Sequence, residues 1–327
     1  MKYLIRSILF STVVGTGLAA AADIQPAIAE FNALHMARAK SMFTALQNVE
    51  QHKNLAAFYL GRIELAAGHL GEARTYLDAS LAIEPNSVDE HYWLAATCGA
   101  SLNLPSNAQN MDLFFCYFQN LDTANAVDPK HVPTLLLYHQ LSVSTSAAAG
   151  GSRDKGWELL AQLERVSKAD AAAARLYALN FDKEFDKATA LAQSIIADYP
   201  NSERALLDAG RFLSNKKQYE SAVIALQKAV ALKATIDSRS SIQNALYELG
   251  NISWQTKTEI DRGIAVLNRA VDPDAFPITA YTNWSYWRLS QLYKLKGDTA
   301  QQQKMLAMLD KTGVEKAKLL AAEMAGK

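Results

Sequence analysis

Two segments of this chain, residues 54–85 and 203–234, repeat one pattern of small and apolar residues. The first carries Leu60-Gly61, Ala73, Leu77 and Pro85, and the second carries Ala209-Gly210, Ala222, Leu226 and Ala229. In both segments the glycine precedes the alanine by twelve positions, and the alanine precedes the leucine by four. Self-similarity at this length is typical of stacked helical hairpins, each of which buries its apolar face against its neighbours. The pattern therefore predicts an all-α chain built from repeated pairs of helices.

The small residues of this pattern have a packing role. Gly61 and Ala73 are expected where two helices cross closely, with leucines filling the space beside the crossing. Such a unit resembles a tetratricopeptide repeat, a family of roughly 34-residue helix-turn-helix units. The residues that fall on the signature positions of that family are Leu60, Gly61, Gly68, Ala73, Leu77 and Pro85.

The resemblance covers residues 54–309 and implies about seven units. The less regular units are expected at 88–129, 132–168, 169–200, 243–271 and 283–309. The fold that follows is an all-α solenoid of helix-turn-helix repeats forming a right-handed superhelix. Residues 23–53 are expected to form an N-terminal capping helix or helix pair, and residues 310–327 a C-terminal capping helix, because the end units of a stack need a polar outer face.

The first 22 residues resemble a secretory signal peptide. Lys2 and Arg6 form a positive region, residues 8–18 are mainly apolar, and Ala20-Ala21-Ala22 before Asp23 form a small-residue cleavage site. The apolar run is shorter than the ~20 residues that a transmembrane helix needs. We therefore expect cleavage near Ala22, a periplasmic mature protein, and no membrane span in the mature chain.

The charge balance bears on the class of partner. Lys plus Arg number 33 and Asp plus Glu number 33, so the chain has no basic excess of the kind that nucleic-acid-binding proteins show. We expect a protein or peptide partner, and no nucleic acid.

The chain has two cysteines, Cys98 and Cys116. They fall in successive predicted helices of one hairpin, and an oxidising compartment would permit a disulfide between them. The alternative is a pair of buried free thiols, because cysteine is often a small core residue. The sequence leaves both possibilities open.

Motifs for catalysis or metal binding are missing from the sequence. No two of the six histidines are spaced for a metal site on one helix, and the chain has no paired Cys-x-x-Cys. Gly151 and Gly156 have the spacing of a phosphate-binding loop, but Trp157 and Glu158 follow where that loop needs Lys and Ser or Thr. This stretch is interpreted as a hairpin turn with Ser152 capping the next helix. We expect no enzymatic activity, no catalytic residue, no metal and no cofactor.

The resemblance also implies where a partner would bind. In this family the first helix of each unit lines the concave surface, and aromatic and arginine side chains are common interface anchors. Carried onto this chain, the predicted partner-binding residues are Arg204, Arg211, Asn215, Tyr247, Asn251, Trp284, Trp287, Gln291 and Lys294. Packing in the core is the alternative for Trp284 and Trp287, and is the preferred role for Trp254.

The sequence thus favours a non-enzymatic periplasmic module that binds a peptide or a partner protein in its concave groove. The second hypothesis is a soluble accessory protein of a solute transporter or of an envelope-assembly system.

Overall fold

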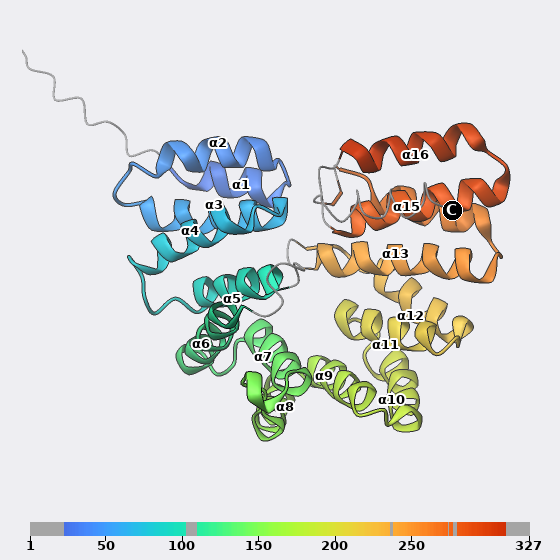
Figure 1. Ribbon diagram of the computed structural model, residues 1–327, viewed down its shortest axis with the longest axis horizontal. Helices are drawn as coiled ribbons and strands as arrows, with labels where there is room; N and C mark the ends of the chain where they lie inside the picture. Colours follow the sequence, from blue (N-terminus) through green and yellow to red (C-terminus); the bar gives the residue numbers. More distant parts are fainter. Residues whose placement is uncertain (1–22, 103–109, 236–237, 274, 277–279, 312–327) are drawn as a thin grey trace, which may run out of the picture.

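A computed structural model of the chain describes residues 23–102, 110–235, 238–273, 275–276 and 280–311. These residues form sixteen α-helices and one short 3₁₀ turn, with no β-strand among them. The helices are arranged in antiparallel pairs that follow one another along an arc, with the first and last pairs at its two ends (Figure 1). The chain is an all-α solenoid of helical repeats, as its sequence predicts.

The N-terminal pair consists of α1 (Gln25–Asn32) and α2 (Met36–Leu46), so the segment predicted as one helix or two contains two. Seven further pairs follow within the described residues. They are α3 (Lys53–Ala67) with α4 (Leu70–Leu81), α5 (Val88–Leu102) with α6 (Met111–Val127), α7 (Val132–Ser144) with α8 (Arg153–Val166), α9 (Lys168–Phe181) with α10 (Phe185–Asp198), α11 (Glu203–Asn215) with α12 (Tyr219–Ala231), α13 (Arg239–Thr256) with α14 (Ile260–Ala270), and α15 (Ala280–Lys296) with α16 (Thr299–Lys311). The predicted signal peptide, and all but the first two residues of the predicted C-terminal capping segment, lie outside the described residues.

In the α3–α4, α11–α12 and α13–α14 pairs, a glycine of the first helix lies against a leucine of the second. A Cβ atom added to Gly61 would lie 2.6 Å from Cγ of Leu77, and one added to Gly210 would lie 2.6 Å from Cγ of Leu226. Both leucines are fully buried. Because real Cβ atoms do not come this close to a neighbour, only glycine permits the helices to approach so far.

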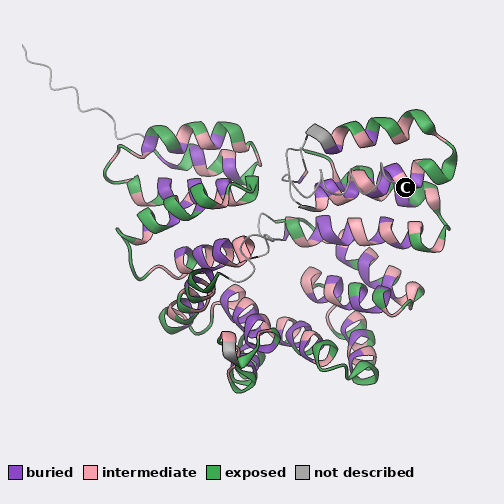
Figure 2. Ribbon diagram, in the orientation of Figure 1, coloured by how far each residue is buried: buried purple, intermediate pink, exposed green. Residues whose placement is uncertain are grey.

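The core runs along the arc instead of filling one centre. Buried residues follow the faces where helices meet, and exposed residues gather on the outward faces (Figure 2). One cluster extends from α9 through α10, α11 and α12 to α13. From α7 onward, the first helix of each pair also contacts the first helix of the next pair, which leaves the second helices on the outside of the arc. Stacking between neighbours therefore buries the apolar face that a single hairpin would expose.

The segment between α7 and α8 is the hairpin turn that the sequence predicts. A 3₁₀ turn at Ala147–Ala149 ends at Gly150, whose φ of +93° lies in the left-handed region that favours glycine. The Ser152 side chain accepts a hydrogen bond from the backbone N–H of Lys155 and caps α8.

One buried histidine helps to fix the same pairs. His139 on α7 is fully buried, and its ring nitrogens lie 2.8 Å from the carbonyl oxygen of Gly156 on α8 and 3.1 Å from that of Ala174 on α9. Burial lowers the pKa of His139, although the two carbonyl contacts oppose that shift. A neutral imidazole has one N–H to donate, so it hydrogen-bonds to one of these two carbonyls at a time.

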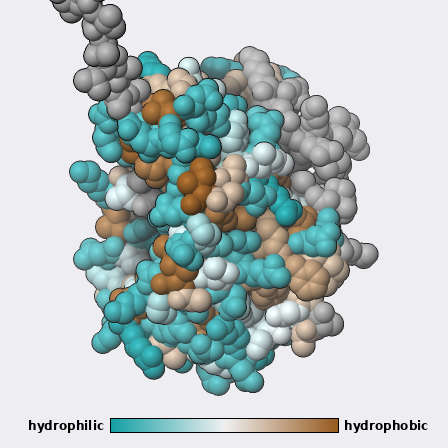
Figure 3. Space-filling view, turned by 90° about the vertical axis from the view of Figure 1, so that its left-hand side faces the viewer, coloured by the Kyte–Doolittle hydropathy of each residue, from teal (hydrophilic) through white to brown (hydrophobic). Residues whose placement is uncertain are grey.

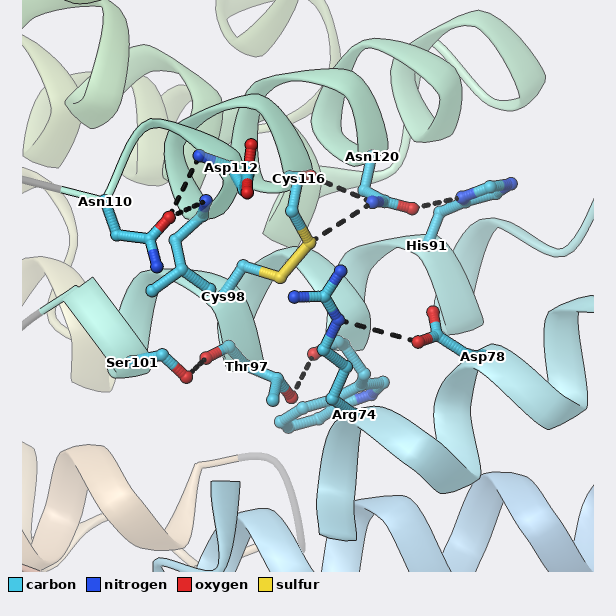
Figure 4. Close-up of a disulfide and its surroundings, with 12 residues drawn as sticks. Arg74, Asp78, His91, Thr97, Cys98, Ser101, Asn110, Asp112, Cys116 and Asn120 are labelled. Carbon is cyan, nitrogen blue, oxygen red and sulfur yellow. Dashed lines mark hydrogen bonds and ion pairs between the residues drawn. A yellow bond between two sulfur atoms is a disulfide. The ribbon is translucent and has the colours of Figure 1, made fainter. Parts of the chain in front are cut away.

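A disulfide between Cys98 and Cys116 joins α5 to α6 (Figure 4). Their Cα atoms are 6.1 Å apart, within the usual range for a disulfide, and both residues are buried. Next to it, the Asn120 amide donates to the backbone carbonyl of Cys116 at 2.8 Å, and the Asn120 carbonyl oxygen lies 2.7 Å from Nδ1 of His91. Of the two possibilities that the sequence leaves open, the structure contains the disulfide.

The two ends of the arc approach each other. A cavity of about 480 Å³ is lined by residues 34–38, at the turn between α1 and α2, and by Pro273 and Phe276, which follow α14. No helix in the described part of the chain is both long enough and apolar enough to cross a membrane.

The glycine contacts predict opposite effects for one chemical change at two positions. Gly210→Ala should lower the free energy of unfolding by about 1–3 kcal/mol, because the added methyl group overpacks against Leu226. Gly71→Ala should leave it unchanged or raise it by up to about 1 kcal/mol, because a Cβ at Gly71 meets no atom within 4 Å and alanine favours the helix. Urea unfolding followed by circular dichroism measures both, and equal effects would contradict the crossing argument.

The disulfide predicts a redox-dependent stability. The cysteines are 18 positions apart, and a cross-link over a loop of this length stabilises a fold by about 3 kcal/mol in the chain-entropy treatment. Dithiothreitol should therefore lower the urea midpoint of the native chain, and Cys98→Ser with Cys116→Ser should reproduce that midpoint with no further response. A native midpoint that does not change on reduction would show that the cross-link adds no stability.

Candidate functional site: the concave groove

Two adjoining cavities lie among the first helices of successive pairs, and the second helix α6 also lines one of them. The larger, about 680 Å³, lies between α5, α6, α7 and α9, and the smaller, about 290 Å³, lies between α7, α9 and α11. Gln140 and Tyr177 line both cavities, so the two form one continuous surface. We call this surface, together with the adjoining inner faces of α11 and α13, the concave groove.

Aromatic and aliphatic side chains predominate among the residues that line the larger cavity, although polar groups also contribute to its exposed surface, and we call it the apolar cavity. Its aromatic and large aliphatic walls are Tyr92, Leu102, Phe114, Tyr117, Leu137, Leu141 and Tyr177. Gly99 makes room at its base, because a Cβ at that position would lie 2.7 Å from the ring of Tyr117. Burial raises the pKa of Tyr117 far above its ordinary value, so its hydroxyl stays protonated at physiological pH.

The smaller cavity is polar, and we call it the polar cavity. Asp208, Arg211 and Asn215 reach it from α11, and Tyr177 and Asn180 reach it from α9. Asp208 follows Arg204 by four positions and precedes Arg211 by three, so all three residues lie on one face of α11. That face turns toward the inside of the arc.

Ion pairs connect this face to the helices on either side of it. Nε of Arg204 lies 3.7 Å from Oδ1 of Asp170 on α9, and Nε of Arg211 lies 3.3 Å from Oε1 of Glu248 on α13. Asp208 lies between the two arginines but has no direct ion pair or hydrogen bond within the described residues. The arginines nearest to it are each paired with another carboxylate.

The environment of the groove disfavours ionisation of its acids. Burial raises the pKa of Asp208 to about 6, and Asp170 adds to the rise, although Arg204 and Arg211 partly oppose it. Burial also raises the pKa of Glu248, and Arg211 offsets part of that rise. The groove therefore holds negative charge where solvent stabilises it poorly.

The charged face continues to α15. Arg288 is about 9% exposed, its guanidinium lies 3.8 Å from the ring centroid of Trp254, and its side chain hydrogen-bonds to Tyr247. Burial lowers the pKa of Arg288, and Tyr247 opposes this. Tyr247 and Trp254 also pack against the apolar cluster of α13 to α16, which is the core role that the sequence favours for Trp254.

The structure places the predicted partner-binding residues in three settings. Arg211 and Asn215 line the polar cavity, Arg204 lies beside it on the same face of α11, and Asn251 hydrogen-bonds to Glu248. Tyr247 contacts Arg288 near the core. The predicted residues on α15 line neither cavity and comprise half-buried Trp284, Trp287 and Gln291 and exposed Lys294.

Sequence reasoning missed several residues of the groove. Asp208 and Arg288 each follow a predicted groove position by four residues and precede another by three, and Glu248 precedes Asn251 by three, so helical periodicity places them on the same faces as the predicted positions. A charged residue on the same helical face as the predicted groove positions is a signal that the sequence contains. Gln140 and Tyr177 carry no comparable signal, because they belong to units with irregular spacing.

A cluster of metal-ligand types occurs elsewhere. Glu64, His69 and Glu72 place one ligand atom each within 4.8 Å of one another. Glu64 is buried and already paired, with Nζ of Lys40 at 2.6 Å and Nδ1 of His69 at 2.8 Å. Burial raises the pKa of Glu64, but these two hydrogen bonds outweigh it and leave the pKa below its ordinary value. The cluster is accounted for by ion pairing that joins α2 to α3 and α4.

The pKa of Asp208 predicts a pH-dependent stability. Between about pH 4 and pH 6 the folded state binds more protons than the unfolded state, so the free energy of unfolding falls as the pH rises through this window. The substitution Asp208→Asn removes this loss of stability, because an amide does not ionise. The variant should be more stable than the native chain at pH 7.5, by roughly 1–2 kcal/mol, and the difference should vanish near pH 4.

Urea unfolding at both pH values measures this difference. Asp198→Asn, which changes an exposed acid on the outer helix α10, serves as the matched control and should show little effect at either pH. An Asp208→Asn variant that is less stable than the native chain at pH 7.5 would contradict the assignment.

Comparison with known proteins agrees with this architecture. Residues 203–236, which span the α11–α12 pair, match the family model of the tetratricopeptide repeat. This is one of the two segments in which the sequence pattern is most regular. No curated protein sequence matches the chain.

The chain is also similar to two solved structures. One is a tetratricopeptide repeat protein from Parabacteroides merdae, with 13% sequence identity, a TM-score of 0.49, and coverage of 82% of this chain and 96% of that protein. The other is a thermophilic tetratricopeptide repeat protein from Thermus thermophilus, with 16% identity, a TM-score of 0.39, and coverage of 73% of this chain and 98% of that protein. The family-model match covers the α11–α12 pair of the solenoid.

Proposed function

We propose that this chain is a non-enzymatic interaction module that binds a peptide, or an extended segment of a partner protein, in its concave groove. The observation that carries the proposal is the continuity of the apolar and polar cavities through Gln140 and Tyr177. Tetratricopeptide repeats generally mediate protein–protein interaction. A continuous surface with a place for an apolar side chain and another for a polar one fits a chain segment, which offers both types at neighbouring positions.

The groove chemistry supports binding more than reaction. Its best-defined charged groups form ion pairs, such as Arg204 with Asp170 and Arg211 with Glu248. At the rim of the apolar cavity, the Ser144 hydroxyl donates to the backbone carbonyl of Gln140 at 2.7 Å. A nucleophilic serine would instead donate to a general base.

We place this function in the periplasm. Two observations support the location: the signal-like sequence of residues 1–22, and the buried disulfide between Cys98 and Cys116. Disulfides persist in oxidising compartments and are rare in a reducing cytosol. The outer surface is compatible with an aqueous environment, because the face on the left of Figure 1 shows small apolar patches separated by hydrophilic residues (Figure 3).

The second candidate is a soluble accessory protein of a solute transporter or of an envelope-assembly system. The volume of the apolar cavity favours it, because about 680 Å³ falls in the range of small-molecule sites. In that case a small apolar ligand would occupy the cavity without contacting the polar cavity.

Selection from a displayed random-peptide library tests the leading proposal. Peptides enriched on the native chain should lose about tenfold or more in affinity for the variant Arg211→Glu with Tyr177→Ala, because Arg211 lines the polar cavity and Tyr177 lines both cavities. Fluorescence anisotropy measures the affinity, and circular dichroism checks that helical content is retained.

The matched control is Arg74→Glu, which reverses the charge of an exposed arginine on the outer helix α4. It should bind the peptides as the native chain does. Equal binding by the double variant and the native chain would show that the peptides use another surface, and the groove assignment would be wrong.

A further inference from the structure

The groove contains one carboxylate that the protein itself leaves uncommitted. Asp208 lines the polar cavity, yet it has no direct hydrogen bond or ion pair within the described residues. Its two nearest cations lie one helical turn away on either side, and each is engaged by another acid: Arg204 by Asp170, and Arg211 by Glu248.

Asp208 has no guanidinium group of its own. Arg204 pairs with Asp170 and Arg211 pairs with Glu248, and Arg288 on α15 also acts electrostatically on Glu248. The guanidinium group of Arg288 lies over the ring of Trp254. A positively charged group is therefore the electrostatic complement of Asp208 when its carboxylate is ionised.

An acid at position 208 lowers the stability of the fold. An amide of the same shape would avoid the loss of hydration that an ionised carboxylate suffers in a partly buried site. Functional sites often contain residues that lower the stability of the fold. A charged side chain that has no partner within the protein is one such residue. A cation supplied by a ligand would stabilise the ionised form of Asp208.

The apolar cavity adjoins the same site. Its aromatic and aliphatic walls include Phe114, Leu137 and Tyr177, and Tyr177 also lines the polar cavity in which Asp208 lies. An occupant that fills both cavities must carry an apolar group close to a cationic one. A polypeptide does this with two nearby side chains, whereas a small polyamine has no apolar group for the larger cavity.

We propose that the concave groove binds a partner segment in which a lysine or arginine lies close in sequence to an aromatic or large aliphatic residue. The cationic side chain pairs with Asp208, and the apolar side chain enters the apolar cavity. This inference rests on the proposed function and specifies the chemistry of the partner.

The pairing makes binding depend on pH. The groups that face Asp208 are Arg204 and Arg211 on its own helix, Asp170 and Tyr177 on α9, Gln140 on α7, Glu248 on α13 and Tyr281 on α15. Because the pKa of Asp208 is about 6, about one molecule in ten has this carboxylate ionised at pH 5. Affinity for a basic segment should thus be about tenfold weaker at pH 5 than at pH 8.

Designed peptides test the inference directly. The probes are acetylated, amidated twelve-residue peptides of Gly and Ser that carry one Arg and one Phe, separated by zero to four residues. Fluorescence anisotropy measures their affinity for the full chain. At the best spacing, replacing Arg by Gln or Phe by Ala should each weaken binding about five- to tenfold.

Two variants of the protein assign these losses to the two cavities. Asp208→Asn should bind the Arg and Gln peptides equally and should lose the dependence on pH, while Asp198→Asn on the outer surface keeps both properties. Ala100→Phe, which adds bulk within the apolar cavity, should remove the preference for Phe over Ala while Asp208 still selects Arg. Thermal melts followed by circular dichroism confirm that each variant is folded.

The outcomes separate this inference from the proposed function. If Asp208→Asn still prefers Arg over Gln as the native chain does, the inference is wrong, although peptides sensitive to Arg211→Glu would leave the groove function intact. If free spermidine competes as well as the Arg–Phe peptide, the ligand is a small amine and the peptide assignment fails. If no probe binds at any spacing, the inference is wrong; if library peptides also ignore the groove variants, the proposed function fails with it.

Discussion

The close contact between a glycine of one helix and a leucine of its partner determines much of this structure. At Gly61 and Gly210 the neighbouring leucine occupies the space where a side chain would begin. Each such contact fixes how far apart two helices lie and which faces they turn toward each other. The contact occurs again between Gly250 and Leu267 in the α13–α14 pair. The stacking of such pairs on one another forms the arc.

A stack of this kind determines where polar residues can meet. Residues far apart in sequence, such as Asp170, Asp208 and Glu248, come together because each lies on the inner face of a first helix. The ion pairs of Asp170 with Arg204 and of Glu248 with Arg211 connect neighbouring units across the groove without contributing to the apolar core. The groove is thus a consequence of the packing, and its chemistry can vary while the Gly–Leu contacts stay the same.

The sequence predicts the repeating architecture well because the packing signal is local: Gly210, Ala222 and Leu226 lie within one unit and repeat at fixed spacing. The site is harder to predict, because its residues meet through contacts between units. Arg211 was found by its position in the repeat, and Asp208 could have been, since it lies on the same helical face. Tyr177 and Gln140 could not, because the units that carry them depart from the regular spacing and their meeting depends on the path of the arc.

At Asp208, the packing of the helices and the chemistry of the groove surface have opposite requirements. Packing brings its carboxylate into a partly buried position and raises its pKa, while the neighbouring arginines pair with other acids and so do not neutralise it directly. A solenoid selected for stability alone would place a neutral side chain there, since replacing the acid disturbs none of the helix crossings. The acid is therefore best explained as part of a binding surface, where a cationic group of a ligand would pair with it.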